Sequence, residues 1–332
     1  MKNFKFNTLY IIESLREGEA KTGQNLYDDM HLQIYYHEGL DVQLHVVQTT
    51  EDWNNTMQNI LDSCQHNGVF PIIHLELHGY ENGIQLTNGD LLSIDKIGEQ
   101  FRQINIATGC NLFLTLGVCK GLYLLFSTHY DRPMPFCGVI GSFEVMRADD
   151  IQLRYGAFYS KFFETFDVGE AYAALKNTET NAPEIFTQYR YIQVDEIFLD
   201  GYQRYIREAC ASSVMDDRAL QAAAESGKIL QNRSVRRKFQ KGFRNEEKKR
   251  RLAYFNQARK AFYMLDLFPE NAERFDVPKT FKELAEKCNI WSQFNTLVNI
   301  ITEKSNALKD VTKEYYQNRK QDWKSRRIYI CD

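Results

Sequence analysis

Three features are missing from this sequence of 332 residues: a Cys-x-x-Cys pair, a long apolar run near the amino terminus, and a large net charge. The seven cysteines are scattered and odd in number, which favours a reducing, cytoplasmic compartment over a disulfide framework. Between Met1 and Arg16 the only apolar run is Leu9–Ile12, too short for a signal peptide or a membrane-spanning helix. We therefore expect a protein without a membrane partner.

The net charge of -3 gives no global indication of a nucleic-acid or membrane partner. Hydrophobic residues make up 43% of the chain and charged residues 26%, as in ordinary soluble globular proteins. The length suffices for one large domain or two ordinary ones, each with a sizeable core.

Strand and helix patterns alternate over the first two thirds of the chain, which predicts a mostly parallel sheet covered by helices on both faces. After Phe198 only helical patterns remain. We therefore predict an α/β domain over residues 1–210 and an all-helical domain over residues 211–332. The predicted strands are Thr8–Leu15, Val42–Val47, Val69–Leu77, Asn111–Val118, Phe136–Val145 and Ile185–Val194, and the later helices are Tyr202–Ala211, Arg218–Leu230, Glu246–Leu267, Thr280–Leu308 and Val311–Arg327.

Shorter signals fill the gaps between these elements. Residues 17–29 are polar with two glycines, which predicts a loop, and two Asn-Gly turns at residues 82–83 and 88–89 predict a small hairpin. Thr49 and Asp52 have the spacing of a helix capping box, as do Thr280 and Glu283.

The segment Asn111–Gly121 is the basis of the predicted central strand and of the candidate active site. It is almost entirely apolar up to Val118, which is typical of a central strand buried on both faces. Cys119 stands at its carboxyl end and is followed by Leu122–Phe126, which predicts the start of a helix. Active sites of open α/β sheets lie outside the carboxyl ends of the strands. The positive end of the helix dipole at a helix start also favours the thiolate form of a cysteine. Cys119 is therefore the candidate nucleophile.

His78 ends the preceding predicted strand and is followed by Gly79. If the two strands are neighbours, His78 and Cys119 reach the same edge of the sheet. A cysteine beside an imidazole is the minimal apparatus for thiol acyl transfer, with the imidazole as base and acid. The backbone N–H groups of Gly79 and Cys119 are the candidate oxyanion hole, and each donor in such a site contributes about 3–4 kcal/mol. No cofactor is required.

These residues carry a resemblance to a known family. Leu77-His78-Gly79 and Gly117-Val118-Cys119-Lys120-Gly121 resemble the motifs of the clan that contains caspases, metacaspases, separases, gingipains and CHAT-domain peptidases. The separation of 41 residues between His78 and Cys119 is comparable to the roughly 50 of caspases. Tyr155-x-x-Phe158-Tyr159 and Gly169-Glu170-Ala171 are similar to a helical pair of CHAT-type domains, so the resemblance covers Thr8 to about Val194.

The resemblance implies a cytoplasmic, caspase-like thiol protease that cleaves protein substrates, with a regulatory or activating protein partner. Compact prokaryotic relatives often serve in antiviral defence. Two departures affect specificity: the caspase Gln-Ala is replaced by Gly117-Val118, and the metacaspase aspartate two positions before the cysteine is absent. Ser142-Phe143 is followed by Glu144 where caspases have an arginine, and Asp149 and Asp150 come soon after. A carboxylate there would favour a basic P1 residue.

Each of these signals also has a plainer interpretation. Glu144, Asp149 and Asp150 are by default solvated loop charges. His74, Glu76 and His78 alternate on one strand face, but about 13 Å of strand separates the two histidines, so we predict no metal site. We interpret His74 as a partly buried, hydrogen-bonded side chain. The other cysteines are expected to pack as small hydrophobic residues: Cys64, Cys110, Cys137, Cys210, Cys288 and Cys331.

Positive charge is concentrated between Lys228 and Arg251. Eleven basic residues stand there against two acidic ones, a local excess of +9 that leaves -12 for the rest of the chain. The default interpretation is an exposed helical face or a linker. Docking to an acidic protein or to a nucleic-acid backbone is the alternative, and the sequence alone does not favour it.

Three hypotheses follow from the sequence. The main one is a cysteine endopeptidase whose helical domain binds a regulator or a protein substrate. The second is a catalytically inactive caspase-like module that mediates protein interactions. The third is an adaptor that binds nucleic acid through Lys228–Arg251.

Overall fold

The structure is a computed structural model that describes residues 4–35, 37–181, 188–209, 212–227, 232–280 and 283. All of these residues belong to one compact unit, Met1–Ile290. The described part is an α/β protein with a mostly parallel mixed sheet and helices at its carboxyl-terminal end. This agrees with the predicted fold class.

The main sheet has six strands in the order β2-β1-β3-β6-β7-β8 within the described residues. The first five are mutually parallel, and β8 at the edge runs antiparallel to β7. A hairpin of β4 (Gly83–Gln85) and β5 (Leu91–Ser93) extends β3, as the two Asn-Gly turns predicted. The strands of the main sheet are β1 (Thr8–Ser14), β2 (Asp41–Val46), β3 (Pro71–Tyr80), β6 (Phe113–Val118), β7 (Gly138–Gly141) and β8 (Arg190–Gln193).

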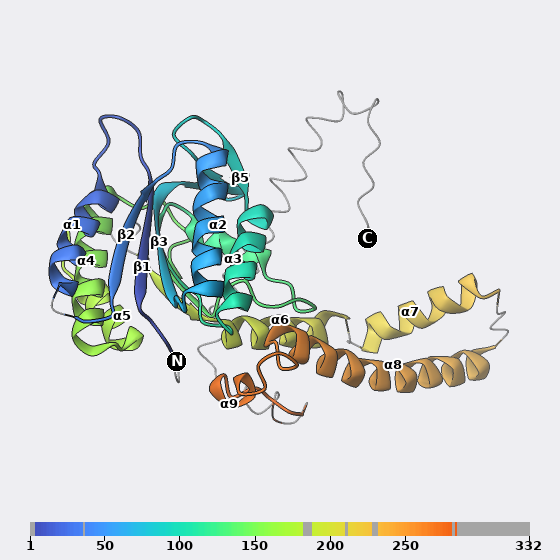
Figure 1. Ribbon diagram of the computed structural model, residues 1–332. Coiled ribbons are helices and arrows are strands. Elements are labelled where there is room, and N and C mark those ends of the chain that lie inside the picture. The colour runs from blue at the N-terminus through green and yellow to red at the C-terminus, as the bar shows by residue number, and fades with distance from the viewer. Residues whose placement is uncertain are drawn as a thin grey trace, which may run out of the picture. The chain divides into compact units, whose positions relative to one another are not determined.

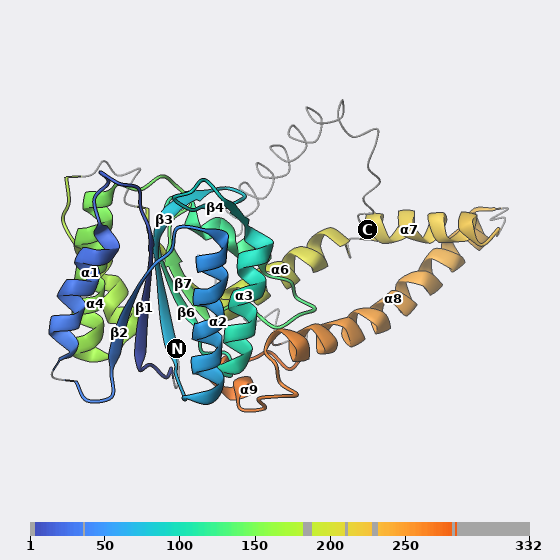
Figure 2. The same cartoon turned by 45° about the horizontal axis from the view of Figure 1, so that its top comes forward.

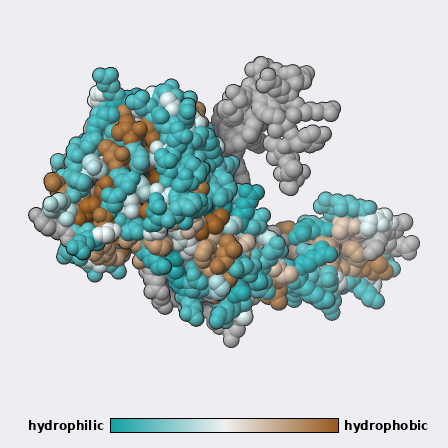
Figure 3. Space-filling view, in the orientation of Figure 1, coloured by the Kyte–Doolittle hydropathy of each residue, from teal (hydrophilic) through white to brown (hydrophobic). Residues whose placement is uncertain are grey.

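Helices cover both faces of the sheet. One face is covered by α1 (Thr22–Ile34), α4 (Ala148–Thr165) and α5 (Val168–Asn177), and the other by α2 (Thr50–His66), α3 (Ile94–Ala107) and the 3-10 helix η1 (Gly121–Ser127) (Figures 1 and 2). Every residue of β1 and β6 is buried, because both strands lie inside the sheet with helices on either side. In the view of Figure 3, hydrophobic residues gather in patches over the α/β layer, on the side of α1 and β2.

The capping box predicted before α2 is confirmed. The Thr49 side chain accepts a hydrogen bond from the Asp52 N–H, and the Asp52 carboxylate accepts one from the Thr49 N–H. At the second predicted box, Thr280 Oγ1 accepts from the Glu283 N–H, but the Glu283 carboxylate accepts from the Lys279 N–H. The helices predicted from this point onward, up to Leu308 and over Val311–Arg327, lie outside the described residues.

Helices α6 (Val194–Ala209), α7 (Ser212–Glu225), α8 (Arg233–Phe262) and the short α9 (Asn271–Arg274) follow the sheet. An aromatic cluster joins α6 to the end of α8, where the Phe198 ring lies 5.1 Å from the rings of both Phe262 and Tyr263. The Met134 N–H donates to the Phe262 carbonyl at 3.1 Å, which ties this end of α8 to the α/β layer. The boundary predicted near Ala211 stays a prediction.

Several local predictions differ from the structure. Residues 17–29 are not one loop, because α1 begins at Thr22. The segment after Cys119 is a seven-residue 3-10 helix and not an α-helix. Helix α8 begins thirteen residues before the predicted Glu246. Among the described residues, the structure has no helix with the length and apolarity needed to cross a membrane.

Candidate active site

His78 and Cys119 are brought to the same edge of the sheet by the register of β3 and β6. The last paired residues of these parallel strands are Leu77 and Val118, and His78 and Cys119 follow them directly. Side chains two residues apart share a face of a strand, so both residues continue the face that carries His74 and Thr115. Those two residues confirm the alignment, because His74 Nδ1 lies 2.8 Å from Thr115 Oγ1. The predicted neighbourhood of β3 and β6 is therefore correct.

The imidazole of His78 is held by a carboxylate that the sequence analysis did not identify. His78 Nε2 lies 3.0 Å from both oxygens of Glu19, in the loop between β1 and α1. Glu19 is itself held, because the Arg16 N–H donates to its Oε2 at 2.7 Å. Burial opposes ionisation of Glu19, but hydrogen bonds from Arg16 and His78 outweigh it and lower the pKa of this carboxyl. With Nε2 engaged by Glu19, Nδ1 is the ring nitrogen left for a substrate or a thiol.

The thiol of Cys119 is bonded to the backbone of the segment that follows β7. The Met146 N–H donates to Cys119 Sγ at 3.3 Å, and Sγ lies 3.6 Å from the Met146 carbonyl oxygen. The turn itself is fixed by Lys120, whose N–H donates to the Glu144 carbonyl at 2.9 Å. Lys120 has a left-handed backbone, φ 56°, which reverses the chain between β6 and η1. Cys119 is half-buried, whereas the other cysteines within the described residues are fully buried.

Histidine and cysteine engage different partners in this conformation. Among the described residues, no hydrogen bond joins the His78 ring to Cys119 Sγ. Glu19 belongs to the β1 side of β3, and Met146 belongs to the β7 side of β6. The two side chains are therefore held by segments on opposite sides of the β3–β6 pair.

Gly79 brings the two strand ends into close contact. A Cβ added at this position would overlap the Cys119 carbonyl oxygen and Val118 Cγ1. Only glycine permits this approach of the two backbones. The candidate oxyanion-hole residues Gly79 and Cys119 therefore come from directly adjacent chain segments.

A buried polar network lies beneath the candidate pair on the same face of the sheet. His74 Nε2 is 2.9 Å from Glu76 Oε1, and Glu76 Oε2 accepts a hydrogen bond from Thr22 Oγ1 at 2.8 Å. His74 is completely buried and not partly buried as predicted, and Tyr159 extends the network because its hydroxyl lies 2.6 Å from Thr115 Oγ1. Such a network is stable in the core because each polar group has a partner.

The three carboxylates predicted for substrate binding do not share one environment. Asp149 is exposed and paired with Arg147, whose hydrogen bonds lower the pKa of Asp149. Asp150 is fully buried in α4, where its Oδ1 accepts from Arg154 Nε at 2.8 Å and from Thr180 Oγ1 at 2.6 Å. Glu144 lies next to the Cys119 turn through its carbonyl bond to Lys120. Of the three, Glu144 is therefore the one whose backbone is bonded directly to the turn after Cys119.

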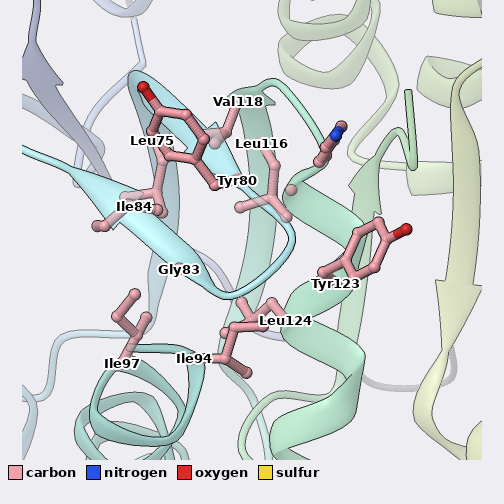
Figure 4. A pocket seen from close by; sticks show the side chains of 12 residues that line it. Leu75, Tyr80, Gly83, Ile84, Ile94, Ile97, Leu116, Val118, Tyr123 and Leu124 are labelled. Atoms are coloured by element: carbon pink, nitrogen blue, oxygen red, sulfur yellow. The ribbon is translucent and has the colours of Figure 1, made fainter. Parts of the chain in front are cut away.

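Two hollows adjoin this edge of the sheet. On the face opposite His78, an apolar pocket lies between the β4–β5 hairpin, β6 and η1, with Leu75, Leu116, Ile97 and Leu124 pointing into it (Figure 4). At the carboxyl edge, an open groove of about 500 Å³ is lined by the loop after β1, the end of β2 and the tip of the hairpin. Its lining includes Leu15, Arg16, Glu17, Lys21, Val46, Gln48, Thr49, Thr87 and Asn88. The groove shares Arg16 with the support of Glu19.

The remaining cysteines of the described residues behave as packed hydrophobic groups. Burial raises the pKa of Cys64 and of Cys137 to about 12, and it also raises the pKa of Cys110. Cys210, Cys288 and Cys331 lie outside the described residues. No group of three His, Cys, Asp or Glu side chains among the described residues has the geometry to hold a metal ion.

The contact between Glu19 and His78 could not be predicted from a local pattern, because the two residues are 59 positions apart in the sequence. The only available signal was a short polar segment after the first strand, at the edge where the candidate pair was expected. No family model matches this chain, and no curated protein matches its sequence, so the caspase-like interpretation remains a prediction that rests on the residues and geometry described above.

Proposed function

We propose that this protein is a cysteine endopeptidase of the caspase-like type, with Cys119 as nucleophile and His78 as general base and acid. The observation that carries the proposal is the placement of both residues directly beyond the last register pair of β3 and β6, with the His78 ring held by Glu19. A nucleophile, a base and a group that orients the base are the recurring elements of such sites.

The proposed reaction uses these groups in sequence. His78 Nδ1 takes the proton of Cys119, and the sulfur attacks the carbonyl carbon of the scissile peptide bond. The N–H groups of Gly79 and Cys119 donate to the resulting oxyanion. His78 then protonates the amide nitrogen, the C–N bond breaks, and water hydrolyses the thioester to release the acid and regenerate the thiol. Glu19 holds the ring throughout and stabilises its charged form.

Substrate binding must turn the Cys119 side chain from Met146 toward His78. Hydrogen bonds between catalytic groups are often formed only in the substrate complex, so the present geometry suits an uncomplexed enzyme. A protein partner that shifts the segment carrying Met146 would have the same effect. We propose such a partner as the activator.

A basic P1 preference is the finer part of the proposal. Glu144 and the exposed Asp149, which is paired with Arg147, are the carboxylates assigned to this preference, whereas Asp150 could meet a substrate only after its buried pair with Arg154 had opened. Fluorogenic peptides that end in Arg or Lys are compared with peptides that end in Asp. Cleavage after Asp alone would reject the basic preference while leaving the peptidase proposal intact.

Selective labelling of Cys119 tests the peptidase proposal. The full chain is treated with a peptidyl acyloxymethyl ketone probe, and labelled residues are identified by mass spectrometry. We expect labelling that is lost in Cys119→Ala, strongly reduced in His78→Ala and unchanged in Cys64→Ala, whose native thiol is buried. Cys119→Ala also serves as a substrate trap in a pull-down. Equal labelling of Cys119 in the native chain and in His78→Ala would exclude the proposed dyad.

One observation favours a second candidate, an inactive module that uses the same fold for protein interaction. His78 and Cys119 each engage another partner and not each other. An inactive module would bind its partner with the same affinity after Cys119→Ala and His78→Ala, and it would show no labelling even when that partner is added. The peptidase proposal requires labelling that increases with the partner.

A further inference from the structure

The first half of α8 carries an unusual excess of positive charge. Between Arg233 and Asn245 the helix has six basic residues and no acidic residue. The next two residues, Glu246 and Glu247, are already paired: Glu246 lies 3.3 Å from Lys249, and Glu247 lies 3.1 Å from Arg250 and 3.5 Å from Arg218 of α7. The carboxylates of α8 therefore do not neutralise the positive charge of its first half.

Most of these cations have no ion-pair partner within the described residues. Arg244 is paired with Asp216 of α7 at 3.5 Å, which leaves an exposed set without carboxylate contacts. The exposed, unpaired cations of α8 are Arg233, Arg236, Arg237, Lys238, Lys241 and Lys248, and we call them the α8 basic surface. Arg233, Arg237 and Lys241 follow each other at spacings of four residues, where like charges are neighbours and destabilise a helix. Binding of a polyanion would remove this repulsion.

Helical geometry places part of this set on one side. At 100° per residue, Arg237, Lys238, Lys241 and Lys248 fall within an arc of about 100°, and they extend over about 17 Å of the helix axis. Glu247, which is buried and contacts Arg218, points to a different side of α8, toward α7. Arg244, which is paired with Asp216 of α7, also lies outside this arc, about 20° from Arg237. The four cations within the arc are exposed, so α7 borders the basic side without covering it.

The chemistry of this side distinguishes between polyanionic partners. Between Arg233 and Lys248 the one large apolar side chain that is strongly exposed is Val235. Protein interfaces have an apolar centre surrounded by polar residues, which this face does not offer. Contacts to nucleic-acid phosphates need only well-placed Lys and Arg, without an apolar centre. The surface thus fits a nucleic-acid backbone better than an acidic protein.

We propose that the α8 basic surface binds the phosphate backbone of nucleic acid without sequence preference. The rest of the chain has an excess of negative charge, so a polyanion is repelled elsewhere and attracted to this helix. The proposal does not depend on the proposed peptidase activity, because the surface shares no residue with the site at His78 and Cys119.

Fluorescence anisotropy of the full chain tests this inference. The probes are a fluorescein-labelled 20-nucleotide DNA single strand of mixed sequence and the corresponding 20-base-pair DNA duplex. Each probe is titrated with the protein at several KCl concentrations between 50 and 300 mM. We expect binding at 50 mM KCl that weakens with a linear dependence of log affinity on log salt. For a duplex, each lost phosphate contact reduces the slope of log affinity against log salt concentration by about 0.9. The double variant Arg237→Gln/Lys241→Gln should therefore reduce this slope by about two. Affinity at 50 mM KCl should fall at least fivefold.

The matched control removes the same charge from the same helix. Lys249→Gln/Arg250→Gln neutralises two cations that already have carboxylate partners, and we expect less than a twofold change. Circular dichroism melting of both variants checks that α8 is retained. Equal losses in the two double variants, no binding at 50 mM KCl, or preferential binding of polyglutamate would each overturn the proposal, the last in favour of an acidic protein partner.

Discussion

Gly117→Ala tests the packing of the buried network beneath the candidate active site. Gly117 pairs in register with Glu76, and a Cβ at position 117 would lie 2.5 Å from Glu76 Oε1 and 2.6 Å from its Cδ. Ordinary contacts begin near 3.4 Å, so the carboxylate would have to move by about 0.9 Å in a core that leaves little room. That shift would take Glu76 away from the groups that hold it.

The magnitude follows from the two hydrogen bonds at stake. Glu76 is bonded to His74 at 2.9 Å and to Thr22 at 2.8 Å, and hydrogen bonds to charged groups are worth about 1.5–3 kcal/mol each. Removal of a strand glycine returns about 0.5–1 kcal/mol of backbone entropy. We therefore expect Gly117→Ala to lower the free energy of unfolding by about 2–5.5 kcal/mol, a large share of the 5–15 kcal/mol typical of a domain.

Urea unfolding at pH 7, followed by circular dichroism, measures this change. The matched control is Gly156→Ala in α4, where an added Cβ meets no atom within 4 Å outside its own helix, and the expected effect is a gain of about 0.5–1 kcal/mol. In a Glu76→Ala background the added methyl finds space, so Gly117→Ala should then cost less than about 1 kcal/mol. Equal costs of Gly117→Ala in both backgrounds would refute the reasoning.

Three further predictions concern charged groups. Burial, followed by repulsion from Asp195, raises the pKa of Glu196 from 4.5 to about 8, so folding stability should fall as pH rises from about 4.5 to about 8; Glu196→Gln should raise the urea midpoint at pH 8.5 and leave it unchanged at pH 4. Asp150→Ala leaves Arg154 buried without its partner and should cost about 3–5 kcal/mol, whereas loss of the exposed Asp149 carboxylate should change stability by less than about 1 kcal/mol in the same urea assay. Glu19→Gln should slow probe labelling of Cys119 on the order of tenfold. This is less than the roughly 10²–10⁴-fold of direct general acid–base catalysis, because Glu19 acts only through His78 and both side chains are one-third exposed. Glu19→Gln should also alter the ¹⁵N shifts of the His78 ring, whereas the Glu17→Gln control should change neither the labelling rate nor the shifts, and unaltered ring shifts in Glu19→Gln would contradict the role given to Glu19.

The sheet could be predicted because its strands have strong local patterns. Buried strands such as β1 and β6 consist mainly of apolar residues, and the two Asn-Gly turns, one on each side of β4, specify the hairpin. Helix α1 was missed because Thr22–Ile34 is polar over most of its length and is held by tertiary contacts that include Thr22 with Glu76. Helix α8 was predicted too short because its first thirteen residues are dominated by charge and polarity and not by an apolar stripe.

Some residues of the candidate site could also be predicted from local sequence patterns, and others could not. His78, Gly79 and Cys119 were identifiable because strand ends and glycines leave a local mark on the sequence. Three features were not identifiable: the contact of Glu19 with His78, the contact of the Met146 backbone with Cys119, and the different burial of Asp149 and Asp150. The first two depend on contacts between segments far apart in the chain, and the third depends on the face of a helix. Spacing alone places a residue at the sheet edge, but it does not determine which neighbour its side chain engages.

The geometry of this edge links stability to the proposed chemistry. His78, Glu76 and His74 share one face of β3, and the loop that supplies Glu19 continues through Lys21 and Thr22 into the start of α1. Thr22 contacts Glu76, so the loop is held at one end by the buried network and at the other by His78. A substitution that displaces Glu76 therefore also removes one of the contacts that hold the start of α1, three residues after the carboxylate that orients His78. For this reason, Gly117→Ala should reduce the labelling rate of Cys119 even under conditions where the chain remains folded, whereas Gly156→Ala should leave that rate unchanged.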